Sequence, residues 1–199
     1  MSAVKPLVLH DRVQTPIAFV NLVALLASTF AAATSAAAPD TRPPPELLAT
    51  AAAIVGVENG AGVYIWNNNL GNLSTREGDA FANPHAPAGA PSWFLHFETP
   101  EAGATEFWRW WLYRYRDSAV AGLAGNVELA ARELYRLGYV AALPGGPTMA
   151  DYERGARAFY RKGWGSALDQ GAPRERTIGQ AIGGPLALGA LGALGMVLR

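Results

Sequence analysis

The sequence contains no cysteine among its 199 residues. This absence excludes disulfide bonds, thiolate nucleophiles and every cysteine-based zinc site. Charge is also scarce, because 16% of the residues are charged and the 16 basic side chains are balanced by 16 acidic ones. A balanced chain lacks the bulk electrostatic attraction that nucleic-acid-binding proteins use. We therefore expect no nucleic-acid partner.

Histidine is equally rare. His10, His85 and His96 are scattered along the chain and do not show the spacing of metal ligands. We therefore expect neither a metal site nor a cofactor. Half of the residues are hydrophobic, which excludes a disordered chain and supplies enough apolar surface for one packed core.

The first long apolar segment runs from Thr15 to Ala38 and contains no charged residue. Its length suits a membrane span. Lys5 and Arg12 upstream, together with the alanines before Pro39, are also typical of a signal peptide. Large apolar residues nevertheless recur at helical spacing, which favours a packed helix. The sequence leaves three interpretations open: a packed first helix, a signal peptide and a retained span.

Helical patterns continue after the prolines of residues 39–45, separated by glycine-rich breaks. They predict helices over Glu46–Val57, Pro100–Tyr115, Asn126–Leu137 and Met149–Trp164. The segment Val63–Pro91 is rich in Asn, Gly, Pro and Ala and predicts an irregular loop lobe that can include short strands. The expected fold class is therefore mainly α. We divide the chain into an N-terminal segment 1–45, a helical domain 46–170 and an apolar tail 171–199.

Aromatic residues crowd the predicted helix Pro100–Tyr115 and occupy both of its faces. They are Phe107, Trp108, Trp110, Trp111, Tyr113 and Tyr115. We expect most of them to pack against neighbouring helices, and some to remain free for stacking on a ligand such as a sugar ring.

Glu58 is a lone carboxylate at the end of the mostly apolar predicted helix Glu46–Val57. Partial desolvation favours the protonated form of a carboxyl group, which suits a general acid near neutral pH. The residues just downstream are suited to sugar hydroxyls and acetamido groups: Trp66, Asn68, Asn69 and Asn72. The alternative is that Glu58 is a solvated helix end and that the asparagines only form turns.

At these residues the sequence resembles the glucosaminidase-type cell-wall hydrolases of the lysozyme superfamily, which include phage and bacterial lysozyme-like domains. Glu58-Asn59-Gly60-Ala61-Gly62 is similar to the family's Glu-Ser/Thr-Gly-x-Gly motif, and Asn68-Asn69-Leu70-Gly71-Asn72 is similar to its Asn-rich turn. The likeness continues in the same order through residues 96–103, 126–139 and 151–152. Three residues depart from the family pattern, namely Asn59, Asn126 and Ala141.

The resemblance implies a lysozyme-like helical fold and hydrolysis of a β-1,4 bond between amino sugars of peptidoglycan. It implies that Glu58 is the general acid and that Tyr139 lies beside it in the cleft. Family members differ on whether a second carboxylate or the substrate's acetamido group stabilises the reacting sugar. Glu77 and Asp79 are the candidate carboxylates.

Such an enzyme would face the cell wall or periplasm, or travel with a virion, and its partner would be the glycan strand. Two alternatives remain. One is a degenerate lysozyme-like module that binds glycan or builds a virion or secretion assembly without cutting. The other is a membrane-active protein whose two apolar ends dominate its function.

The tail segment 181–198 is uncharged and has glycines at positions 189, 192 and 195. Its apolar surface requires a cover, so we expect it to dock on protein or membrane. We predict that truncation after Arg176 changes the solubility, the oligomeric state or the membrane or partner association of the protein. Sedimentation and vesicle flotation measure these properties. A truncated protein that matches the full chain in all of them, and in activity, would contradict a docking role.

Overall fold

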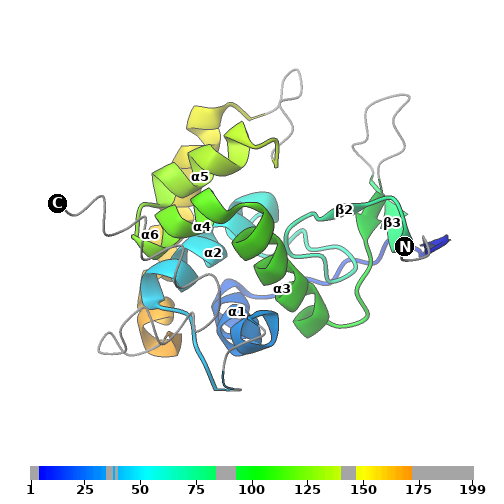
Figure 1. Ribbon diagram of the computed structural model, residues 1–199, viewed down its shortest axis with the longest axis horizontal. Coiled ribbons are helices and arrows are strands. Elements are labelled where there is room, and N and C mark those ends of the chain that lie inside the picture. Colours follow the sequence, from blue (N-terminus) through cyan, green and yellow to red (C-terminus); the bar gives the residue numbers. More distant parts are fainter. Residues whose placement is uncertain (1–4, 35–37, 39, 84–92, 140–146, 172–199) are drawn as a thin grey trace.

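The computed structural model describes residues 5–34, 38, 40–83, 93–139 and 147–171. The described part is mainly helical, with a small sheet at one side of the helices (Figure 1). The helices are α1 (Phe19–Ala33), α2 (Pro45–Glu58), α3 (Pro100–Arg109), α4 (Arg116–Leu123), α5 (Val127–Arg136) and α6 (Met149–Gln170). The apolar tail predicted to dock lies outside the described residues.

Helix α2 is the centre of the core. Pro45 occupies its first turn, where the missing N–H costs nothing, and its residues from Leu47 to Gly56 are all buried. Helices α1, α4, α5 and α6 surround it. Helix α6 approaches closely because Gly56 on α2 faces the ring of Phe159 and Gly155 on α6 faces Val57. The predicted helix Glu46–Val57 is therefore confirmed within one residue at each end.

Helix α1 packs in the same core as α2. Leu22, Val23, Leu26 and Phe30 are all at most 1% exposed. The indole of Trp108 on α3 donates a hydrogen bond of 2.8 Å to the Leu26 carbonyl. The apolar N-terminal segment thus forms a packed helix. Among the described residues, no helix combines the length and the apolar character required to cross a membrane.

The predicted helix Pro100–Tyr115 is divided in the structure. Helix α3 passes into a π-helical turn, η1 (Trp110–Arg114), and the chain then bends into α4, which the sequence analysis did not predict. The turn distributes the aromatic residues over different surroundings: Phe107, Trp108, Trp111 and Tyr115 are buried, Trp110 is half-buried and Tyr113 is exposed. Wider spacing in the π turn changes the helical phase, which explains how both faces can carry aromatic residues.

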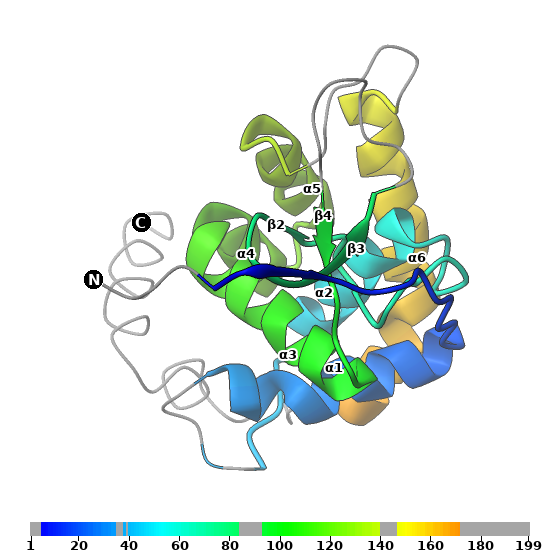
Figure 2. The same cartoon turned by 90° about the vertical axis from the view of Figure 1, so that its right-hand side faces the viewer.

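The sheet contains β1 (Leu7–Leu9), β2 (Ser74–Thr75), β3 (Gly78–Ala82) and β4 (Trp93–Leu95) in the order β1-β3-β4-β2. Strand β1 pairs in parallel with β3, and the other two pairings are antiparallel. The N-terminal chain crosses the loop lobe before it enters α1 (Figure 2). A strand this early in the chain was not predicted.

Gly103 on α3 lies at a close contact between this helix and the loop lobe. A Cβ atom at this position would overlap the carbonyl oxygen of Asn68. We predict that Gly103→Ala lowers the free energy of unfolding by about 1–3 kcal/mol, the usual cost of overpacking a tight contact. Urea denaturation measures this change.

The matched control is Gly165→Ala on α6, where an added Cβ meets open space. This variant should be neutral or more stable by about 0.5–1 kcal/mol, because alanine favours a helix more than glycine does. If both variants have the same stability, the close contact at Gly103 does not constrain the fold.

Candidate active site

Glu58 is the last residue of α2 and lies where the helical core meets the loop lobe. Its carboxyl group is held from two sides. The hydroxyl of Tyr152, a buried residue of α6, donates a hydrogen bond of 2.9 Å to Oε1. The Asn72 amide donates one of 3.2 Å to Oε2, and its nitrogen lies at the same distance from the Glu58 backbone carbonyl. Glu58 therefore has one fixed orientation.

Burial raises the pKa of Glu58 above its ordinary value, and the hydrogen bonds from Tyr152 and Asn72 oppose the rise. Loss of water penalises the charged form of the carboxyl, whereas the two donors stabilise it. The C-terminal end of α2 adds partial negative charge, which also disfavours ionisation. The site thus combines burial, which favours the protonated form, with two donors positioned to stabilise the anion left after the proton departs.

The turn beyond α2 is held by its asparagine side chains. Asn59 is fully buried, and its amide donates to the carbonyl oxygens of Val55 and Leu70. These two bonds tie the helix end to the turn that carries Asn72. A serine or threonine hydroxyl, which the family motif has at position 59, offers a single donor.

Asn68 and Asn69 stabilise the same turn and lie 8% and 1% exposed. The amide of Asn68 donates to the Phe97 carbonyl, and that of Asn69 donates to the carbonyls of Leu73 and Leu95. These donors are engaged within the protein. Contact of Asn68 and Asn69 with a glycan therefore stays a prediction that this hydrogen bonding does not favour.

Trp66 is half-buried, and the Arg12 guanidinium lies 4.4 Å from the centre of its ring. One face of the indole is thus covered by a cation. Asn72, also expected at a glycan, instead contacts Glu58. The structure brings Asn72 to the predicted acid and leaves the role of Trp66 in sugar binding as a prediction.

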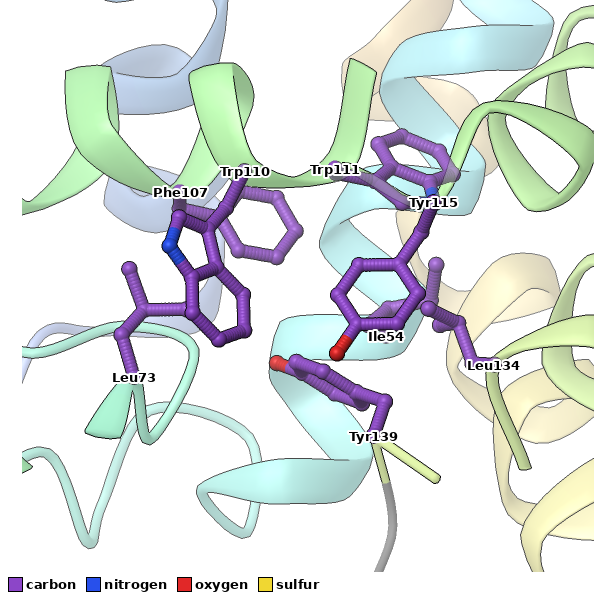
Figure 3. Close-up of a pocket in the computed structure, with 8 residues that line it drawn as sticks. All are labelled: Ile54, Leu73, Phe107, Trp110, Trp111, Tyr115, Leu134 and Tyr139. Carbon is purple, nitrogen blue, oxygen red and sulfur yellow. The ribbon is translucent and has the colours of Figure 1, made fainter. Parts of the chain in front are cut away.

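Tyr139 follows α5 and packs among aromatic rings, with ring centres 5.3 Å from Tyr115 and 6.4 Å from Trp110. Together with Ile54 and Leu73, these three residues line a narrow apolar pocket beside α2 (Figure 3). The remaining lining residues are Phe107, Trp111 and Leu134. The pocket therefore lies between the aromatic residues of α3 and η1 and the central helix at Ile54.

The hydroxyl of Tyr139 donates a hydrogen bond of 2.6 Å to the carbonyl of Gly71, the residue before Asn72. Burial raises the pKa of Tyr139 well above its ordinary value, and the negative charge of Glu58 raises it further. Tyr139 thus lies within electrostatic reach of Glu58 although 81 positions separate them in the sequence. It stays a neutral donor that supports the turn holding Asn72.

Glu77 and Asp79 lie at a different pocket, of about 400 Å³, lined by Lys5, Thr75, Glu77, Gly78, Asp79, Leu95 and His96. A Glu77 carboxylate oxygen accepts the backbone N–H of Lys5, and Asp79 pairs with the ring of His10 at 2.7 Å. The structure therefore brings these two carboxylates together with the N-terminal chain. Neither one lies among the contacts that hold Glu58.

The sequence pattern alone does not reveal the contact of Tyr152 with Glu58. Asp151-Tyr152 is one of the motif positions, yet nothing in the spacing shows that a residue 94 positions away would reach Glu58.

In the described ranges, no group of three or more His, Asp or Glu residues could hold a metal ion. Comparison of the chain with protein-family models, curated proteins and solved structures finds no match.

Tyr152→Phe should raise the pKa of Glu58 further, because it removes the shorter of the two side-chain hydrogen bonds that stabilise the anion. Carbon-13 NMR of the Glu58 carboxyl, followed through a pH titration, measures the shift. Tyr135→Phe is the matched control, because its hydroxyl contacts the Pro147 carbonyl instead. An unchanged Glu58 titration in Tyr152→Phe would show that this hydroxyl does not stabilise the anion.

Proposed function

We propose that this protein cleaves a β-1,4 bond between amino sugars in peptidoglycan, with Glu58 as the general acid. The observation that carries the proposal is a carboxyl group at the end of an apolar helix that two neutral donors, Tyr152 and Asn72, hold in place, with burial acting to raise its pKa. A general acid must keep its proton until the leaving oxygen is in place. The family resemblance of the Glu58 and Asn-turn motifs supports the same chemistry.

In the proposed reaction the proton of Glu58 moves to the glycosidic oxygen as the C1–O bond breaks. The negative charge that develops on Glu58 is then stabilised by the Tyr152 hydroxyl and the Asn72 amide, which already point at its two oxygens. Because these donors need no rearrangement, their stabilisation grows with the charge in the transition state. Tyr139 assists indirectly by holding the Gly71 carbonyl next to Asn72.

Glu77 and Asp79 are weaker candidates for a second carboxylate, since their contacts are with Lys5 and His10. We infer that the developing positive charge on the sugar is met by the substrate's own acetamido group or by water. The proposed partner is the peptidoglycan glycan strand, and the proposed location is the cell wall, the periplasm or a virion. The distribution of products between reducing and anhydro ends, measured by mass spectrometry, identifies the route.

Glu58→Gln tests the acid directly, because glutamine keeps the shape of the side chain but has no acidic proton. We expect turnover of purified cell walls to fall by roughly 10²- to 10⁴-fold, the usual contribution of general acid catalysis. Circular dichroism and thermal unfolding check that the fold is retained. The control is Glu106→Gln, which removes a surface pair with Arg109 and leaves α2 untouched.

A Glu58→Gln protein that keeps more than half of wild-type turnover would exclude Glu58 as the acid. Absence of turnover in the wild-type protein, combined with retained binding to cell walls, would instead support the degenerate glycan-binding module. A zymogram and a sedimentation assay on the same walls separate these outcomes.

A further inference from the structure

A cluster of four side chains fastens the N-terminal chain to the loop lobe, away from Glu58. We name residues 7–15 the N-terminal strap; it begins with β1 and ends at Thr15. The four side chains are Asp79 of β3, His10 of the strap, His96 after β4 and Asn67 of the Asn-rich turn. Asp79 contacts His10, His10 stacks on His96, and His96 contacts Asn67.

Asn67 is the centre of this fastening, and its amide has a single possible orientation. Its Oδ1 accepts the backbone N–H of Val13 at 2.7 Å, and its Nδ2 donates to the Asp11 carbonyl at 2.8 Å. Exchanging the two amide atoms would place donor against donor and acceptor against acceptor. The second hydrogen of Nδ2 therefore points at His96 Nδ1, which lies 2.9 Å away.

His96 Nδ1 must accept this hydrogen, so it carries no proton while the strap is closed. A proton on Nδ1 would place an N–H group against the N–H of Asn67 and would charge a ring stacked 3.9 Å from His10. His10 differs, because its Nε2 faces the Asp79 carboxylate at 2.7 Å and keeps that contact when the ring is protonated. The two stacked histidines thus respond differently to acid.

We infer that the N-terminal strap is an acid-opened latch, in which protonation of His96 Nδ1 breaks its contact with Asn67 and releases residues 11–13 from the Asn-rich turn. Opening would expose the edge of β3, to which β1 is paired. It would also expose the side chain of Asn67. The latch is a property of the fold, and it does not depend on the activity proposed for Glu58.

The charges around His96 agree with this direction. Desolvation is the main cause that lowers the pKa of His96 below its ordinary value, and the charge of His10 adds to it. The charges of Asp79 and Glu98 act to raise the pKa. Lys5 is a further charged neighbour of Asp79. Because the closed strap binds the His96 proton less readily than an open strap would, closure is complete above the ordinary histidine pKa of about 6.5 and weakens as the pH falls below it.

Amide hydrogen exchange in the full chain tests the latch. The reporters are the backbone N–H groups of His10, Val13 and Thr15, which donate to Ala80, Asn67 and Ile65. After correction for intrinsic rates, we expect their protection to fall about tenfold between pH 7.5 and 5.5, since the lower pH lies one unit below the ordinary histidine pKa. Amides of α2 should keep their protection, which separates strap opening from global unfolding.

His96→Gln removes the titration and keeps an oxygen that can accept from Asn67, so its strap protection should not change with pH. The control is His85→Gln, at the third histidine, which lies outside the described residues and should leave the wild-type response intact. A fall in strap protection that is equal in His96→Gln and wild type, or that is lost in His85→Gln, would overturn the proposal.

Asn67→Asp provides a second test that needs no loss of the histidine. It places a carboxylate against His96 and removes the donor to the Asp11 carbonyl, so the strap should be weaker at neutral pH and protonation of His96 should now strengthen the contact. We expect strap protection in this variant to rise on acidification. A fall of the wild-type size in Asn67→Asp would also overturn the latch.

Discussion

The structure depends on fixing the carboxyl of Glu58, a half-buried residue, at the end of its most buried helix. Removing water from a carboxylate is costly unless the group stays protonated or receives hydrogen bonds, and here Tyr152 and Asn72 supply the hydrogen bonds. The donors come from opposite directions: Tyr152 from α6 and Asn72 from the turn. Helix α6 must therefore pack closely on α2, which Gly56 and Gly155 allow, and the turn must fold back on the helix end.

The turn folds back on the end of α2 because several of its residues adopt positive φ angles. Asn67, Asn68 and Asn72 have φ angles of 49°, 58° and 49°, in the left-handed region that asparagine tolerates better than other residues with a side chain. Several amides then bind carbonyls that burial would leave without partners. The same residue type thus provides both the conformation and the hydrogen bonds. This explains why an Asn-rich sequence that suggests sugar contacts can instead be occupied in building the turn.

Much of the helical fold could be predicted because its patterns are local. The prolines before residue 46 and the apolar run after it predict α2, and the helical pattern from Asn126 to Leu137 predicts α5. The break at Trp110 could not be predicted, because a π-helical turn reflects packing of Trp111 and Tyr115 on other helices. The position of Glu58 at an apolar helix end predicts it as a candidate acid. Its partner Tyr152 comes from a helix 94 positions away, and no local pattern encodes that contact.

The acid site and the strap impose opposite requirements on pH. Glu58 can donate only while it is protonated, so the proposed activity falls as the pH rises through its raised pKa. The strap closes only while His96 Nδ1 is free of a proton, so acid loosens it. Both groups act on one turn, because Asn67 fastens its first part to the strap and Asn72 fastens its last part to Glu58. The loop lobe is therefore best ordered above the histidine range, and the acid is best protonated below its own pKa. Burial of Glu58 at the end of α2 raises its pKa, and so moves the pH range in which it is protonated towards the range in which the strap is closed.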